Sequence, residues 1–229
     1  MSFFNLFLIF KAMIINWFGQ ACFKIQGDKT VLVTDPFAAA YGLKVPRLAA
    51  DIVTVSHDHA DHNNIAAVRA VTGDQPFIIN QPGEYEIKNT FVYGISAFHD
   101  DEEGIERGPN IIYRIEMDGI TLVHLGDLGH ALTNGQIEKL EGTDILLIPI
   151  GGVYTIDTAQ ATKLISQLEP RIVIPMHYQI PGLKIGKKIE GVEKFCKEMG
   201  VKASESLDKL KISKKDLPPE DLKVIILQA

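Results

Sequence analysis

Short apolar runs separated by turn residues dominate the first half of the chain. Residues 13–17, 21–26 and 30–34 alternate or run apolar, with Gly19 and Gly27-Asp28 between them, which is typical of β-strands joined by tight turns. Further strands are predicted at residues 51–55, 76–79, 84–87, 90–98, 111–117 and 119–124, the last two forming a hairpin. Between them, Asn64–Val71 has one apolar face and follows good capping residues, which predicts a short helix.

The second half of the chain alternates between two periodicities. A helix at residues 133–140, a strand at 144–150, a helix at 157–168 and a strand at 171–176 are predicted in turn. This order is typical of βαβ units with parallel strands. A helix at 190–199 ends at Gly200, and two last strands are predicted near 208–213 and 222–228. The pattern as a whole indicates an α/β layered domain.

Candidate chemistry is concentrated in one hexapeptide, His57-Asp58-His59-Ala60-Asp61-His62, which directly follows the predicted strand at 51–55. A loop that leaves a buried strand can direct its side chains to one point. Neutral imidazole suits zinc or iron, and a carboxylate compensates the charge of the cation. The hexapeptide therefore predicts a metal site rather than a solvated polar turn.

Other candidate ligands occupy matching places in the chain. Four polar residues each lie just past the C-terminal end of an apolar, β-branched run: His99, Asp127, His130 and His177. The ends of strands that run the same way are neighbours at one edge of a sheet, where ligand sites form. We therefore expect these residues and the hexapeptide to contribute to a single site.

Composition restricts the partners of the protein. The chain of 229 residues is 46% hydrophobic, enough for one large domain, and its 29 acidic and 23 basic residues give a net charge of −6. This balance argues against nucleic-acid binding, which needs clustered Lys and Arg. Lysines concentrated after residue 180 predict a solvated surface or, alternatively, a rim that attracts an anionic substrate.

The cysteines and the N-terminus bear on location. Cys22 and Cys196 show no zinc-type spacing and indicate a reducing compartment, so we expect a cytoplasmic protein. The apolar residues 3–10 are too short to span a bilayer. We interpret residues 1–12 as a dispensable extension and residues 13–229 as the functional domain. The oligomeric state cannot be predicted from the sequence.

Several motifs together resemble those of the metallo-β-lactamase superfamily. They are HxHxDH at residues 57–62, the later His99, Gly126-Asp127 after a strand, and Pro175-Met176-His177-Tyr178. The segments Trp17-Phe18-Gly19 and Asp35-Pro36-Phe37 are similar to a small single-domain branch of hydrolases related to L-ascorbate-6-phosphate lactonase. The resemblance covers roughly residues 13–229 and implies a four-layer αββα sandwich.

The resemblance also implies two metal positions that share one carboxylate. His57, His59 and His99 would hold the first metal, and Asp61, His62 and His177 would hold the second. Asp127 would bridge the two. We expect two divalent ions, zinc first and manganese or iron as alternatives. Such a pair activates a bridging hydroxide as nucleophile, and Asp61 would orient it or shuttle its proton.

Other residues receive secondary roles or ordinary structural ones. Asp35 would fix the tautomer of a ligand histidine or form a turn before proline. His130 would protonate the leaving group or be a plain loop histidine, and Tyr154 would bond a substrate oxygen. A loop at residues 107–110 would cover the site or be a surface turn. For His124, which lies within a strand, a core position is favoured over a ligand role.

These expectations define a leading hypothesis, a dinuclear metal-dependent hydrolase acting on a small ester, lactone or phosphate-containing molecule. One alternative is an RNA or phosphodiester hydrolase, against which the acidic charge counts. A di-iron redox protein is another, although the chain carries no motif for an electron donor. A non-catalytic metal-binding protein is the third.

Overall fold

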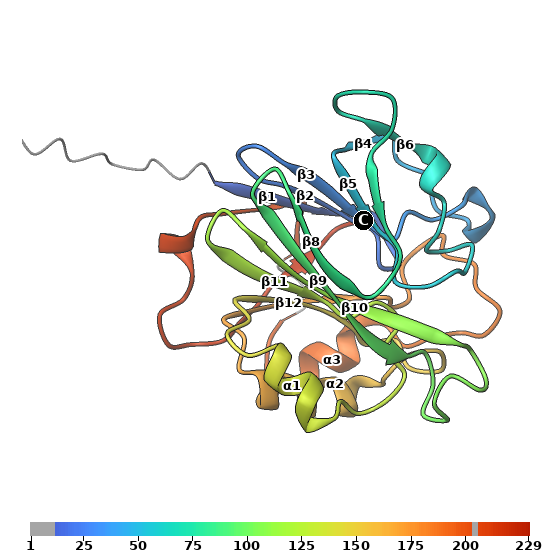
Figure 1. Ribbon diagram of the computed structural model, residues 1–229. Coiled ribbons are helices and arrows are strands. Elements are labelled where there is room, and N and C mark those ends of the chain that lie inside the picture. Colours follow the sequence, from blue (N-terminus) through green and yellow to red (C-terminus); the bar gives the residue numbers. More distant parts are fainter. Residues whose placement is uncertain (1–11, 203–205) are drawn as a thin grey trace, which may run out of the picture.

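The computed structural model describes residues 12–202 and 206–229, which form two β-sheets facing each other, with helices along one outer side (Figure 1). The predicted extension at residues 1–12 lies outside the described residues apart from Ala12. The first strand begins at Met13, as the sequence pattern predicts.

The first sheet has six strands in the order β15–β1–β2–β3–β5–β7. They are β1 (Met13–Trp17), β2 (Phe23–Gln26), β3 (Val31–Thr34), β5 (Ile52–Thr54), β7 (Phe77–Ile79) and β15 (Leu210–Ile212). β1, β2 and β3 form an antiparallel meander, whereas β5 and β7 run parallel to β3. Alternate residues of β1, namely Met13, Ile15 and Trp17, are buried in the main core, which fits the period of a strand.

The second sheet has seven strands in the order β16–β13–β12–β11–β10–β9–β8. They are β8 (Gly83–Ile87), β9 (Thr90–Phe98), β10 (Pro109–Met117), β11 (Ile120–His124), β12 (Ile145–Pro149), β13 (Ile172–Met176) and β16 (Lys223–Val224). β8 to β11 are antiparallel, and β11, β12, β13 and β16 are parallel. Both sheets are therefore mixed, and the change to βαβ order falls where the sequence predicts it.

Helices cover the outer side of the second sheet. They are α1 (Asn134–Lys139), α2 (Thr158–Leu168) and α3 (Val192–Glu198), and Figure 1 shows them together below β9 to β12. α1 and α2 each begin with a capping box, at Thr133 and Asp157. α2 buries Leu164 and Ile165 in the main core, as the predicted amphipathic pattern requires.

The outer side of the first sheet corrects one prediction. The expected helix at Asn64–Val71 is wrong: the chain forms a short 3-10 helix, η2 (Ile65–Ala67), and then strand β6 (Val68–Ala70). β6 pairs in parallel with β4 (Leu48–Ala50), and Val68 joins a small separate hydrophobic cluster. Strand pairing and burial of this β-branched residue outweigh the helical propensity that the three alanines of the segment supply. Another 3-10 helix, η1 (Ala39–Tyr41), lies nearby in sequence.

The C-terminal strands are shorter than predicted. The expected strand at residues 222–228 is split, because β16 pairs with β13 whereas β17 (Ile226–Leu227) pairs with β14 (Ser206–Leu207). The 3-10 helix η3 (Lys214–Asp216) lies between β15 and β16 in the chain. The strand predicted at 208–213 corresponds to β15, which closes the first sheet beside β1.

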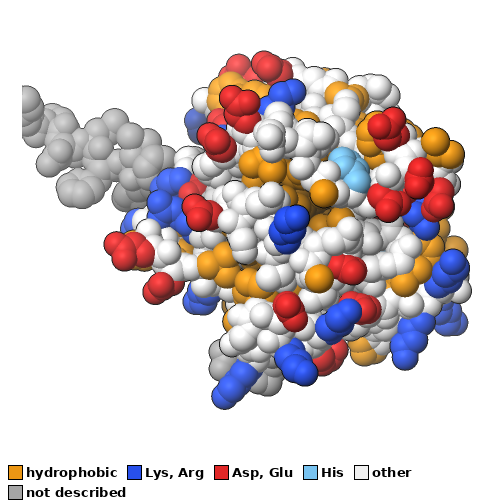
Figure 2. Space-filling view, turned by 90° about the horizontal axis from the view of Figure 1, so that it is seen from below, with side chains coloured by type: hydrophobic (Ala, Val, Ile, Leu, Met, Phe, Trp, Pro, Cys, Tyr) orange, Lys and Arg blue, Asp and Glu red, His pale blue; other side chains and the backbone are white. Residues whose placement is uncertain are grey.

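Helix hydropathy and surface charge are the properties on which membrane or polyanion binding would depend. None of the helices among the described residues is long and apolar enough to cross a membrane. Seen from below, acidic and basic side chains are interspersed rather than gathered into one charged patch (Figure 2).

Candidate metal centre

The histidine-rich hexapeptide leaves the C-terminal end of β5 and turns back on itself at once. The backbone N–H groups of His62 and Asn63 donate to the carbonyl of His59 at 2.9 and 3.0 Å. This turn buries His57 and His62, leaves Asp61 half-buried, and exposes His59. Four of the six residues therefore belong to the groups of ligand atoms, whereas Asp58 is exposed and belongs to none of them.

The structure brings all seven predicted metal ligands together. Their ligand atoms form three groups, each within 4.8 Å: His57, His59 and His99; His57, His62 and Asp127; and Asp61, His62 and His177. The first and third of these correspond to the two metal positions that the sequence resemblance implies. The seven side chains follow strand ends, as predicted, but these strands belong to two sheets rather than to one. The hexapeptide follows β5 of the first sheet, and the other three ligands follow β9, β11 and β13 of the second.

Asp127 lies between the two positions. Its Oδ2 is 3.3 Å from Nε2 of His62, 3.3 Å from Nε2 of His99 and 3.1 Å from Nε2 of His177. The carboxylate thus contacts imidazoles of both the first and the second position. Such a placement suits a bridging ligand.

A polar side chain and a glycine hold Asp127 in place after β11. Asn110 on β10 accepts a hydrogen bond from the Asp127 N–H at 3.0 Å and donates to the carbonyl of Leu125 at 2.9 Å. Gly126 has φ +56°, and a Cβ there would collide with Asn110. Only glycine therefore fits the turn that delivers Asp127. Asn110 was part of a predicted loop, but its role in placing Asp127 was not predicted.

Asp35 fixes the orientation of two ligand imidazoles. Its carboxylate accepts from Nδ1 of His62 at 2.9 Å and from the Ser56 hydroxyl at 2.6 Å, and this hydroxyl contacts Nδ1 of His57 at 2.9 Å. In a neutral ring that keeps its proton on Nδ1, as a metal ligand must, Nε2 directs its lone pair toward the site. The predicted tautomer-fixing role of Asp35 is therefore supported by its contacts. Ser56, which relays it to His57, was not predicted.

The electrostatics of the site follow from burial and crowding of charges. Burial and the neighbouring His62 lower the pKa of His57 to about 3, so this imidazole is neutral at pH 7. Burial opposes ionisation of Asp127, but the charges of His177 and His62 hold its pKa well below the usual range. Burial likewise opposes ionisation of Asp35, but the hydrogen bond from His62 and the charges of His124, His62 and His57 together lower its pKa. Both carboxylates are thus anionic at neutral pH.

The residues present fit a metal ion. Buried Nε2 atoms of His57 and His62 and the buried Oδ1 of Asp127 have no hydrogen-bond partner in the described part of the protein. Unpaired buried polar atoms are costly, and here they belong to one cluster of nitrogen and carboxylate ligands. Cations with nitrogen and oxygen preferences, zinc foremost, satisfy such atoms.

A cavity of about 450 Å³ opens onto these ligands. Besides metal-ligand candidates, its wall contains Gln20, Tyr41, Arg107, Tyr154 and Ile185. Arg107 and Tyr154 were singled out from the sequence, whereas Gln20 and Tyr41 were not. Gln20 lies in the turn between β1 and β2, and its position there gave only a turn signal.

Two other histidines form hydrogen bonds with backbone groups. His124 is buried in β11, where Nε2 donates to the carbonyl of Ala21 at 2.9 Å, in agreement with the predicted core position. His130 accepts from the Phe98 N–H at 3.1 Å through Nε2 and donates to the Ala131 carbonyl at 2.8 Å through Nδ1. It is not part of the cavity wall. The predicted proton-donor role of His130 gains no support from this geometry.

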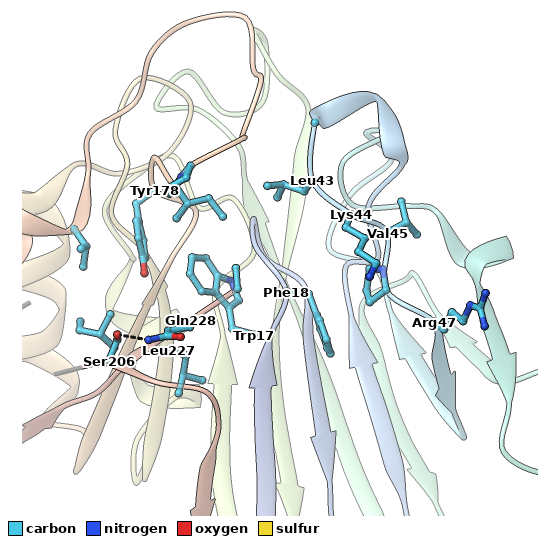
Figure 3. Close-up of a pocket in the computed structure, with 17 residues that line it drawn as sticks. Trp17, Phe18, Leu43, Lys44, Val45, Arg47, Tyr178, Ser206, Leu227 and Gln228 are labelled. Atoms are coloured by element: carbon cyan, nitrogen blue, oxygen red, sulfur yellow. Dashed lines mark hydrogen bonds between the residues drawn. The ribbon is translucent and has the colours of Figure 1, made fainter. Parts of the chain in front are cut away.

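A larger cavity of about 1080 Å³, shown in Figure 3, is lined by none of the seven ligand candidates. Trp17, Phe18, Leu43 and Tyr178 give it a mostly apolar wall, and its only charged side chains are lysine and arginine among the residues described. Among the described residues that line it, none is a His, Cys, Asp or Glu that could bind a metal through its side chain. We therefore place the chemistry at the smaller cavity.

The fold and this site define a metallo-β-lactamase-type protein, and comparison with known proteins agrees. A family model described as the beta-lactamase superfamily domain matches residues 14–177. A crystal structure of a candidate Zn-dependent hydrolase of the metallo-β-lactamase superfamily from Thermotoga maritima superposes with a TM-score of 0.74 at 32% identity, covering 94% of this chain and 100% of that one. The predicted metallo-β-lactamase-like α/β fold is thereby confirmed, and the structure shows that both of its large sheets are mixed.

Two relatives narrow the assignment. A UPF0173 metal-dependent hydrolase from Archaeoglobus fulgidus is 30% identical over 216 residues, which is 82% of this chain and 93% of the relative. Another, from Thermoplasma acidophilum, is 33% identical over 186 residues, covering 72% of this chain and 82% of the relative. The chain belongs to the metallo-β-lactamase superfamily and, within it, to the UPF0173 metal-dependent hydrolase family.

Proposed function

We propose that this protein is a dinuclear metal-dependent hydrolase that acts on a small ester, lactone or phosphate-containing substrate. The observation that carries the proposal is the position of Asp127. Its Oδ2 lies within 3.3 Å of imidazole nitrogens from both three-residue groups. A carboxylate shared in this way supports two neighbouring metal ions rather than one.

The ligand sets differ in charge. His57, His59 and His99 would hold the first ion with three neutral imidazoles. Asp61, His62 and His177 would hold the second ion with one carboxylate and two imidazoles, and Asp127 would serve both. Divalent ions in such positions supply Lewis acidity and activated water at neutral pH.

Asp61 suits the task of orienting the attacking water. It lies in the cavity wall, and its side chain is 16% exposed, so it is reachable from the substrate side. Burial opposes its ionisation, but the hydrogen bond and charge of His62 lower its pKa. The ionised carboxylate accepts a hydrogen bond from water and thereby directs the oxygen lone pair toward the substrate.

The size and the lining of the cavity favour a small, anionic substrate. The cavity volume of about 450 Å³ lies in the range of small-molecule sites and is too small to enclose a polymer chain. Arg107 is the only Lys or Arg among the described residues that line it. Its guanidinium would pair with a phosphate or carboxylate of the substrate, and Tyr154 would bond a neutral oxygen. The narrower likeness to L-ascorbate-6-phosphate lactonase stays a prediction.

The test is hydrolysis by the metal-loaded protein on a panel of small esters, lactones and phosphoesters. We expect turnover on at least one class, its loss with a chelator, and its return when zinc or manganese is restored. Asp127→Ala should lack turnover. Asp144→Asn should keep it, because Asp144 lies just before β12, at the opposite end of the sheet from the ligands. A protein that binds two metals and hydrolyses nothing on the panel would contradict the proposal. RNA cleavage would indicate the phosphodiesterase alternative, and two bound irons with redox activity the di-iron one.

A further inference from the structure

Gln20 is a buried amide whose side chain forms one hydrogen bond among the residues that the structure describes. Its side chain is 0% exposed, and Nε2 donates to Oδ2 of Asp61 at 3.0 Å across 41 residues of sequence. Its Oε1 has no hydrogen-bond partner in the described part of the protein. Burial of an amide is costly, and the contact with Asp61 is the one polar interaction that offsets this cost.

The geometry sets the direction of this hydrogen bond. The NH₂ end of the Gln20 amide faces Oδ2 of Asp61 at 3.0 Å, where the nitrogen donates and the carboxylate oxygen accepts, and the opposite orientation would bring two oxygens together. A donor on a carboxylate makes a strengthened hydrogen bond. Gln20 therefore fixes how the Asp61 carboxylate is turned.

The main chain of Gln20 reaches a further metal-ligand candidate. Its carbonyl accepts from the His177 N–H at 3.1 Å and from Nε1 of Trp17 at 2.9 Å. Trp17 in turn lies 4.9 Å from the ring of Tyr178, the residue after His177 (Figure 3). These contacts hold Gln20 at φ +48° and His177 at φ +49°, left-handed conformations that non-glycine residues adopt only when their surroundings impose them.

The Asp61–His62–His177 position is thus fixed at every ligand. Gln20 holds Asp61 through its side chain and His177 through its carbonyl, and Asp35 holds His62. The His57–His59–His99 position differs, since its member His59 is exposed. We propose that Gln20 is a positioning residue for the Asp61–His62–His177 position and sets the metal affinity of that position alone. This inference rests on the proposed metal centre.

The test separates the two positions before Gln20 is changed. His59→Asn disables the first position through an exposed residue, and His177→Asn disables the second with a residue that tolerates the left-handed backbone. Gln20→Met is then introduced into each background, because Met matches the length of Gln but cannot donate. The affinity for Zn²⁺ is measured by competition with a chromophoric chelator.

We expect Gln20→Met to weaken Zn²⁺ binding about 10- to 100-fold in the His59→Asn background. In the His177→Asn background the affinity should stay within about twofold, because Gln20 forms no hydrogen bond with His57, His59 or His99 in the described part of the protein. Gln20→Asn, which suits the left-handed turn but is too short to reach Asp61, should reproduce the loss and covers the case in which Gln20→Met does not fold. Gln136→Met, which removes a comparable side-chain donor from α1, should change neither affinity.

Three results would overturn the inference. Unchanged affinity of the second position would show that Gln20 does not position Asp61. An equal loss in both backgrounds would indicate a general disturbance of the fold. Failure of the His59→Asn protein to bind Zn²⁺ with Gln20 intact would overturn the metal position itself, and so would be distinguished from a failure that concerns Gln20 only.

Discussion

Replacing Asp35 by Asn tests whether a carboxylate behind the ligands organises the site. Asp35 is 0% exposed and accepts three hydrogen bonds, from the Ser56 N–H at 2.7 Å, the Ser56 hydroxyl at 2.6 Å and His62 Nδ1 at 2.9 Å. Asn has nearly the same shape and tolerates the φ of +39°, so the backbone is not the cause of any effect. Only one acceptor oxygen remains in place of two.

The magnitude follows from these contacts. At least one buried donor loses its acceptor, which lowers the free energy of unfolding of the metal-free protein by about 1–3 kcal/mol. His62 can no longer donate from Nδ1 to a carboxylate, so its Nε2 is a poorer ligand. Loss of such a partner weakens metal binding about 10- to 100-fold, or about 1.4–2.7 kcal/mol at 1.36 kcal/mol per tenfold change.

The assay combines urea unfolding of the metal-free protein with Zn²⁺ competition against a chelator. Asp144→Asn is the matched control: Asp144 is 3% exposed, accepts from the Thr121 N–H at 2.9 Å and from Lys214 at 2.7 Å, and lies at the opposite end of β12. It should lose stability and keep its metal affinity. An Asp35→Asn protein with the Zn²⁺ affinity of the wild type would refute the reasoning.

The pH dependence of the free energy of unfolding, compared between the wild type and the Asp35→Asn protein, provides a second test. The pKa of Asp35 is lowered in the folded protein from its ordinary value of 3.8, so its ionised form stabilises the fold at neutral pH. That contribution is lost as the pH falls below the ordinary value toward the lowered one. The stability difference between the wild type and Asp35→Asn should therefore shrink in acid, and a difference that grows in acid would contradict this sign.

Three further outcomes are expected. A Cβ at Gly129 would collide with the backbone of His99, so Gly129→Ala should lower the free energy of unfolding by about 1–3 kcal/mol. Gly135 in α1 has open space around it, so Gly135→Ala should raise the free energy of unfolding by about 0.5–1 kcal/mol. Equal melting temperatures of the two variants would disprove the distinction. His130→Ala should lower the melting temperature and keep most of any hydrolytic activity; a loss of about 10²-fold or more with metal content unchanged would instead restore the proton-donor role. Both cysteines are buried, and burial raises the pKa of Cys22, so a thiol reagent at pH 8 should label neither in the native protein and both in urea; rapid native labelling would contradict the packing.

The sequence predicts most of the fold because strand periodicity and turn residues are local signals. β1 and β9 begin and end where the pattern places them, and α2 differs by its cap alone. The segment at residues 64–71 was predicted wrongly because its pairing partner, β4, is determined by tertiary structure. A short apolar run can become a helix or a strand, and here strand pairing decided.

In the candidate site, too, some residues could be predicted from the sequence and others depend on tertiary structure. The seven ligand candidates could be found because imidazoles and carboxylates that follow strand ends are rare in combination. Gln20, Ser56 and Asn110 could not, since an amide or hydroxyl in a turn or strand has many ordinary uses. What distinguishes Gln20 is a contact across 41 residues, which only the folded chain reveals.

Elemental metal analysis of protein purified without chelators or an affinity-metal column tests the central claim most directly. The account predicts two divalent ions per chain, zinc or manganese, and one fewer in the His59→Asn protein. Retention of none or one ion by the wild type, with no increase when metal is added back, would contradict the dinuclear site.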